Sequence, residues 1–116
     1  MAANLRAASA LVREAAADGA RFIATPENTT LMAADARAKL ASSFSEAEDP
    51  AIPVFAALAL ELGVHLLIGS VAIKVSDSKT ANRSFLFAPD GRVTARYDKI
   101  HLFDVALSGS EAYAES

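Results

Sequence analysis

Cysteine is absent from this 116-residue sequence, and its absence excludes a whole class of chemistry. Without thiols, the chain forms no disulfide, no thiolate metal site and no thiol nucleophile of its own. Tryptophan is also absent, and glycine and proline contribute only five and four residues. This scarcity of chain breakers, together with 53% hydrophobic residues, is typical of a folded chain rather than a disordered one. We therefore expect one domain with a single hydrophobic core.

The sequence also lacks a basic excess and a long apolar run. Eleven Lys and Arg against fourteen Asp and Glu give a net charge of −3, and the basic residues are spread singly along the chain. This distribution argues against nucleic acid as a partner. The longest apolar stretch, residues 51–60, is interrupted by Pro53 and is well short of the roughly 20 residues that a membrane span requires. We expect a cytoplasmic protein with no membrane partner.

The first part of the chain alternates between a helical and a strand pattern. Apolar residues recur at helical spacing over residues 5–16, with Asn4 available as a cap and Gly19 placed to end the helix. Residues 21–25 then indicate a short buried strand. Pro26 marks the end of this strand, because proline lacks the donor that a central strand needs.

The middle of the chain predicts a second helix and a second strand. Residues 28–50 indicate a connection that carries a short helix within 33–45. A longer helix follows, with Pro53 in its first turn and Gly63 at its end. Residues 64–73 form a strand candidate that is apolar on both faces in its middle, so we expect both faces to be covered.

A hairpin is predicted in the last third of the chain. Two strand patterns, residues 82–88 and 92–97, are separated by Pro89, Asp90 and Gly91. This turn combines a fixed φ at proline, side-chain bonding at aspartate and a permissive φ at glycine. The order helix, strand, helix, strand and hairpin predicts an α/β domain with helices packed on a sheet.

Three charged residues stand where they could carry chemistry. Glu27 directly follows a buried strand, so a rigid element would aim its side chain outward. Lys99 follows the last strand, where a lysine could stabilise an oxyanion, and Glu115 is the last residue but one. Taken alone, each would be read as a solvated surface charge. The two histidines, His65 and His101, have no partners at metal-ligand spacing, so we predict neither a metal site nor a cofactor.

Two segments of the chain carry motifs that are found in a known family. The segment Thr25-Pro26-Glu27-Asn28 is similar to the one that carries the catalytic glutamate of the nitrilase (carbon–nitrogen hydrolase) superfamily, although a hydrophobic residue usually occupies the place of Thr25. Residues 82–105, which end in YDKIHLFDV, are similar to the family's hairpin and catalytic-lysine segment. The resemblance extends over essentially the whole chain.

This resemblance implies an αββα sandwich and a Glu–Lys–Cys triad. Glu27 would be the general base for the thiol, Lys99 would stabilise the tetrahedral oxyanion, and Glu115 would help to position the substrate. Thiolate attack on an amide carbon would release ammonia and leave a thioester, which water would then hydrolyse. The implied substrate is a small non-peptide amide, with ω-amides of dicarboxylic acids among the candidates, and the implied assembly is a homo-oligomer.

The chain also departs from the family pattern. The family's cysteine lies on a later strand-to-helix elbow that this sequence does not contain, so Glu27 has no thiol to deprotonate. The family's first strand and the second half of its sandwich are likewise not matched. We expect residues 1–116 to be an incomplete carbon–nitrogen hydrolase domain whose sheet has unpaired edges. Ala106 and Ser108 replace an acid and a proline that are common in amidase-type members, which leaves the substrate open.

Three functions are compatible with these observations. The complete protein could be an amidase that uses Glu27, Lys99 and a cysteine outside this chain. It could instead be a catalytically inactive member that serves as a binding or assembly module, which the absence of cysteine favours. An unrelated α/β ligand-binding domain would require both matches to be coincidental. The hydrolase hypothesis expects Glu27 and Lys99 to converge from neighbouring strand ends.

Overall fold

The computed structural model describes residues 2–27, 29, 36–99, 104–106 and 112–114. The helices and strands in these ranges follow the predicted α/β order. They are α1 (Ala2–Ala17), β1 (Phe22–Ala24), α2 (Ala36–Ser42), α3 (Ala51–Leu62), β2 (His65–Ser76), β3 (Lys79–Phe87), β4 (Val93–Asp98), β5 (Asp104–Ala106) and β6 (Ala112–Ala114). Within these ranges, no helix is both long and apolar enough to cross a membrane.

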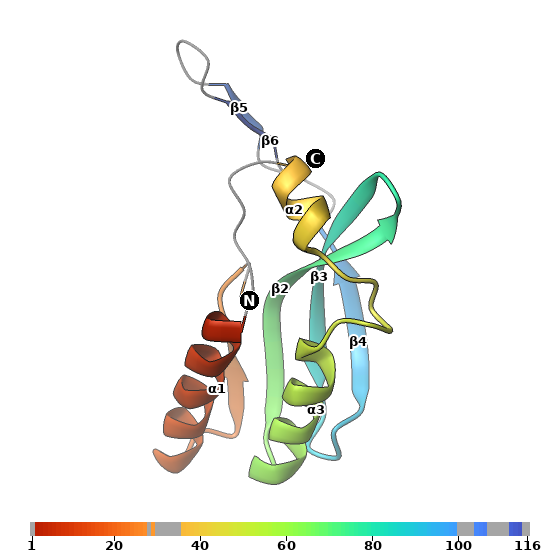
Figure 1. Ribbon diagram of the computed structural model, residues 1–116. Coiled ribbons are helices and arrows are strands. Elements are labelled where there is room, and N and C mark those ends of the chain that lie inside the picture. Colours follow the sequence, from red (N-terminus) through yellow and green to blue (C-terminus); the bar gives the residue numbers. More distant parts are fainter. Residues whose placement is uncertain (1, 28, 30–35, 100–103, 107–111, 115–116) are drawn as a thin grey trace.

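Four strands form one mixed sheet in the order β1-β2-β3-β4 (Figure 1). The strands β1 and β2 are parallel, whereas β2–β3 and β3–β4 are antiparallel hairpins. The parallel pair is possible because the long connection through α2 and α3 returns the chain to the starting end of the sheet. The remaining strands, β5 and β6, pair with each other in a separate antiparallel sheet. Within the described four-stranded sheet, β1 and β4 are therefore the edge strands.

The hydrophobic core lies between the sheet and the helices α1 and α3, which cover one of its faces (Figure 1). The three aromatic rings at its centre are fully buried, and Phe85 and Phe87 stack with centroids 6.2 Å apart. Phe55 of α3 lies with its ring centroid 6.5 Å from that of Phe87. Burying one such ring stabilises the fold by roughly 2–3 kcal/mol. This core fixes α3 on β2 and β3, the two central strands of the sheet.

Two glycines adopt a positive φ where the sequence pattern predicts a helix end and a turn. Gly63 adopts the left-handed conformation, with φ of 64°, and ends α3 one residue after Leu62. Gly91 has φ of 85° in the turn between β3 and β4, where the Asp90 carboxylate accepts a hydrogen bond from the Arg92 N–H. The predicted helix end at Gly63 and the predicted turn at Gly91 are therefore confirmed, and a left-handed φ strongly favours glycine at both.

Other boundaries differ from the prediction. The helix α1 includes Asn4, so this residue is not its cap. The predicted strands end at residue 73 and begin again at residue 82, but the observed ladder continues between them, because Lys74 pairs with Thr80 and Ser76 with Lys79. Backbone pairing has extended both strands beyond their apolar parts. The prediction that both faces of β2 are covered holds for residues 70–73, which are buried in succession. It does not hold fully for Leu67, which is only half-buried.

Asp49 is a buried carboxylate at the start of α3. Its side chain is 1% exposed, and its Oδ1 accepts a hydrogen bond of 2.8 Å from the Ala51 N–H. Within the part of the chain that the structure describes, Asp49 Oδ2 has no hydrogen-bond partner. Burial accordingly raises the pKa of Asp49, although the bond from Ala51 opposes this shift. The charged form is therefore disfavoured in the folded protein.

We expect Asp49→Asn to change how stability depends on pH. Because folding raises the Asp49 pKa, the contribution of this group to the free energy of unfolding is largest below the ordinary value of 3.8 and is lost as pH rises through the folded pKa. Asparagine keeps the acceptor for Ala51 but does not titrate. Relative to the wild type, the variant should therefore gain stability between acidic and neutral pH, as measured by urea unfolding at both pH values.

Asp98→Asn is the control for this experiment, with the opposite sign. The hydrogen bond from the Arg83 guanidinium lowers the pKa of Asp98, so its stabilising effect is present at neutral pH and is lost on acidification. This variant should therefore lose stability, relative to the wild type, as pH rises from acidic to neutral. The same slope for both variants would contradict the proposed environment of Asp49.

Candidate active site

Glu27 and Lys99 converge on one place in the structure. The Lys99 Nζ lies 3.4 Å from the Glu27 Oε1, and the side chains are 27% and 60% exposed, respectively. Glu27 follows β1 and Lys99 follows β4, so the two residues arrive from opposite edges of the four-stranded sheet. The expectation of neighbouring strand ends is therefore wrong, because β2 and β3 lie between them. The turn after β1 packs onto β2 at Gly69, whereas Lys99 stays paired with β3, so the two central strands hold the segments whose side chains meet.

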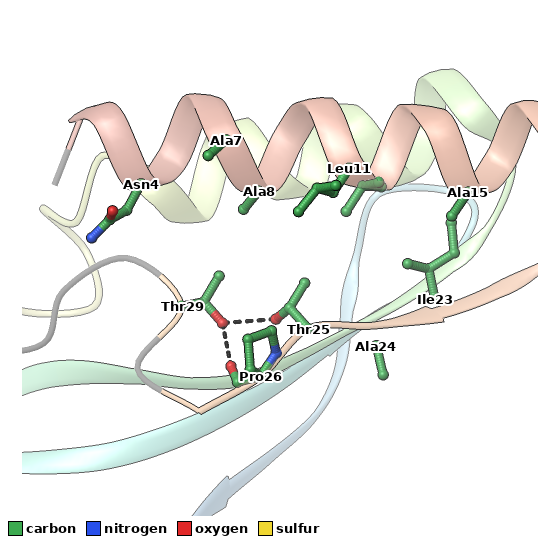
Figure 2. A pocket seen from close by; sticks show the side chains of 11 residues that line it. Asn4, Ala7, Ala8, Leu11, Ala15, Ile23, Ala24, Thr25, Pro26 and Thr29 are labelled. Atoms are coloured by element: carbon green, nitrogen blue, oxygen red, sulfur yellow. Dashed lines mark hydrogen bonds between the residues drawn. The ribbon is translucent and has the colours of Figure 1, made fainter.

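The turn that carries Glu27 is held by a chain of side-chain hydrogen bonds (Figure 2). The Gly69 N–H donates to Thr25 Oγ1 at 3.1 Å, and the Oγ1 atoms of Thr25 and Thr29 are 2.7 Å apart. Thr29 Oγ1 donates to the Pro26 carbonyl at 2.5 Å. A hydroxyl has one hydrogen, so Thr25 must donate to Thr29. The four groups then form one directional chain that closes the turn around Glu27.

Two backbone bonds fasten the same turn to β2. The Thr25 N–H donates to the Leu67 carbonyl at 2.9 Å, and the Thr29 N–H donates to the Ser70 carbonyl at 3.0 Å. These bonds lie on either side of Glu27. The turn is therefore attached at both ends to a central strand, which fixes the backbone from which the carboxylate projects.

Gly69 allows this turn to lie directly on β2. A Cβ atom at position 69 would lie 2.2 Å from the Thr25 carbonyl oxygen and 2.5 Å from the Pro26 carbonyl group. The register of β2 on β3 shifts between Ile68 and Val71, and Ser84 Oγ donates to the Gly69 carbonyl at 2.7 Å. Only glycine leaves room for backbone at this distance.

Gly69 was not among the residues predicted from the sequence, although a signal for it exists. An isolated glycine inside a strand pattern indicates a bulge or a close approach of another backbone, and Gly69 is both. Thr25 was interpreted only as a departure from the family pattern. Its hydroxyl instead links β2 to Thr29, a role that a hydrophobic residue could not take.

Lys99 is anchored by the other central strand. Its N–H donates to the Asn82 carbonyl at 2.9 Å, which continues the β3–β4 ladder one residue past Asp98. The ammonium is therefore presented from a residue that is still paired with the sheet. Its moderate exposure places the charge at the boundary between protein and solvent, where its field is screened less than in water.

Three further residues were singled out in the sequence, Glu115, His65 and His101. Glu115 and His101 lie outside the described residues. His65 stacks on Phe22 at the far end of β1, with ring centroids 6.5 Å apart. Clusters of three or more potential metal ligands are absent from the part of the chain that the structure describes.

A cavity of about 340 Å³ lies between α1 and the turn that follows β1 (Figure 2). It is bounded by the alanine-rich face of α1, by Ile23 and by Thr25 and Thr29, and neither Glu27 nor Lys99 lines it. The small side chains of the alanines on α1 leave this space unfilled, and Val12 is the one buried residue of that helix. Its lining is mainly apolar and offers only hydroxyl and amide groups, so we place the candidate chemistry at Glu27 and Lys99 instead.

Known proteins are similar to this chain in both sequence and fold. Omega-amidase NIT2 of Homo sapiens is 31% identical over 114 residues, which are 97% of this chain and 40% of that protein. The deaminated glutathione amidase of Synechocystis sp. is 30% identical over 116 residues, which are 97% of this chain and 42% of that protein. The chain thus spans about two fifths of the length of these relatives.

Solved structures match the fold at lower identity. The NitFhit protein of C. elegans has a TM-score of 0.77 at 20% identity, over 97% of this chain and 28% of that one. An amidase from Nesterenkonia sp. has a TM-score of 0.74 at 23% identity, over 86% and 37%. The predicted fold class, a partial nitrilase-like α/β domain, is thereby confirmed. The sequence model of the carbon–nitrogen hydrolase family matches residues 1–116, and the chain therefore belongs to this family.

Proposed function

We propose that the protein containing this chain hydrolyses the carbon–nitrogen bond of a small non-peptide amide. The observation that carries this proposal is the 3.4 Å approach of Lys99 Nζ to Glu27 Oε1, made by two segments that are each bonded to a central strand. Support comes from the relatives, since both the NIT2 protein and the Synechocystis protein are named as amidases. The nucleophile would be a cysteine outside residues 1–116.

In this proposal, Glu27 and Lys99 divide the control of charge. The Glu27 carboxylate takes the proton from the thiol, and the thiolate forms a bond to the amide carbon. The carbonyl π electrons move onto oxygen, and the Lys99 ammonium stabilises that negative charge. When the oxyanion collapses, the carbon–nitrogen bond breaks and the proton held by Glu27 leaves with ammonia. Water, deprotonated by Glu27, then attacks the thioester and releases the acid.

The geometry suits these roles for a physical reason. The Glu27 side chain is 60% exposed, so a reactant can reach it, whereas the backbone of its turn is fixed. A fixed backbone with an accessible side chain removes much of the entropic cost of aligning the base with its proton. The neighbouring ammonium is in place before the reaction, so no reorganisation is needed when the oxyanion forms.

A second function is favoured by one specific observation, the absence of cysteine from the sequence. A product that consists of these residues alone would have no thiol nucleophile and would act as a binding or assembly module. Residues 1–116 expressed alone should then release no ammonia from any amide. Turnover by this cysteine-free chain would contradict the triad that we propose.

The decisive experiment measures ammonia released by the complete protein from amides and nitriles of matched size. Succinamate represents ω-amides of dicarboxylic acids, and butyramide has the same chain length without the carboxylate. We expect turnover of amides, and a preference for succinamate if the protein is an ω-amidase. A complete protein that contains the cysteine but hydrolyses none of these compounds would contradict the amidase proposal.

In the variant Glu115→Gln of the complete protein, KM for the preferred amide should rise more than kcat falls.

A further inference from the structure

We propose that the Arg83–Asp98 ion pair positions Lys99, so that Arg83 and Asp98 are positioning residues of the candidate site. The inference rests on the proposed function only for its consequence in catalysis. Its structural content, that the pair sets the distance between Lys99 and Glu27, is tested separately below.

The pair sits at the last step of the ladder before Lys99. Arg83 of β3 lies opposite Asp98 of β4 in the antiparallel register. Arg83 Nε donates to Asp98 Oδ1 at 2.6 Å, and Nη2 donates to Oδ2 at 3.0 Å. This two-pronged geometry fixes the direction of a carboxylate as well as its distance. The residue that follows Asp98 is Lys99, so the orientation of the strand end determines where its side chain begins.

A third residue holds the guanidinium in place. Glu46, in the connection between α2 and α3, accepts a bond of 3.3 Å from Arg83 Nη1. The same carboxylate accepts bonds of 2.9 and 3.0 Å from Arg96 Nε. The Arg83 and Glu46 side chains are 20% and 29% exposed, so their contact is less screened than an ordinary surface pair, whereas Asp98 is 49% exposed. Glu46 therefore restrains the Arg83 guanidinium independently of its contact with Asp98.

The position of β4 explains why such a device would be needed. It is an edge strand of the described sheet, and its residues from Thr94 to Asp98 are exposed. Little apolar packing therefore restrains its end, and an edge strand frays easily. The backbone bond from Lys99 to Asn82 is the next ladder contact along the chain. The ion pair therefore acts at the step directly before Lys99 and restrains the end of β4 from which this residue leaves.

A zero-length carbodiimide cross-link measures the positioning directly. The reagent joins a carboxylate to an amine only in contact, so the yield of the Glu27–Lys99 isopeptide, read by mass spectrometry, reports their approach. We expect Arg83→Gln and Asp98→Asn each to lower this yield roughly fivefold, because each removes the same charge-assisted pair. The double variant should be no worse than either single one, since the two residues act as a unit.

Arg92→Gln is the matched control. Arg92 forms an ion pair of 2.9 Å with Asp90 in the β3–β4 turn and is 82% exposed, so this variant also breaks an Arg–Asp pair but at the other end of the hairpin. Its cross-link yield should equal that of the wild type. Amide hydrogen exchange at Lys99 provides a second measurement: it should accelerate in Asp98→Asn, an isosteric change, and stay unchanged in Arg92→Gln. Unaltered cross-linking and exchange in folded Arg83→Gln and Asp98→Asn would overturn the proposal.

The same variants separate this inference from the amidase proposal. In the complete protein, Asp98→Asn should lower kcat with little change in KM, because Lys99 acts on the oxyanion rather than on the bound substrate. If the cross-link is lost but Lys99→Ala retains full turnover, the positioning pair stands and the catalytic role of Lys99 falls. If Lys99 proves essential and the cross-link is insensitive to Arg83 and Asp98, the reverse holds.

Discussion

Replacing Lys99 by alanine in the complete protein is expected to lower kcat for amide hydrolysis by roughly 10²–10³-fold, the usual effect of removing one oxyanion donor. The ammonium is held at the edge of the sheet by the Lys99 N–H bond to Asn82, and alanine keeps that backbone bond while removing the charge. Stability should therefore change little. Ammonia release under saturating amide, compared with the midpoint of urea unfolding, separates the two effects.

Glu27→Gln should reduce turnover by at least as much, roughly 10²–10⁴-fold, because an amide cannot act as a general base. The side chain keeps its size, and the turn keeps its bonds through Thr25 and Thr29. Lys79→Ala and Glu14→Gln are the controls, since both are exposed residues of the same types that lie outside the candidate site. Turnover at the wild-type rate in Glu27→Gln or Lys99→Ala would remove that residue from the mechanism.

Gly69→Ala is expected to displace the turn that carries Glu27. The new Cβ would lie 2.2 Å from the Thr25 carbonyl oxygen, a contact with backbone that no side-chain rotation can relieve. Either β2 or the turn must move, and overpacking of this kind costs about 1–3 kcal/mol. We expect urea unfolding to show that loss, together with a large fall in the Glu27–Lys99 cross-link and in turnover of the complete protein.

Gly19→Ala is the matched control for this variant. Gly19 has φ of 100°, so alanine there is strained by its own backbone, but nothing lies within 4 Å of the added Cβ. This variant should lose stability by about 1–2 kcal/mol and keep both the cross-link and the turnover. A Gly69→Ala protein with a wild-type cross-link would show that the close packing of the turn on β2 does not position Glu27.

Local features of this fold could be predicted from the sequence because their causes are local. The spacing of apolar residues in α3, its end at Gly63 and the turn at Gly91 depend on the φ and side-chain pattern of a few adjacent residues. The bond from the Ala51 N–H to Asp49 is equally local, because the two residues are only two positions apart. Strand ends were less predictable, since pairing with a partner strand extended β2 to Ser76.

The sequence by itself determined which residues are candidates: Glu27 and Lys99 stand in motifs that resemble a known family, and no cysteine accompanies them. Only the tertiary structure decided that these two side chains meet, from opposite edges of a four-stranded sheet, and which groups hold them there. The contacts responsible are Gly69 with Thr25 and Arg83 with Asp98. Each joins residues that are distant along the chain, and contacts of that kind depend on how strands and turns pack, which short-range patterns do not encode.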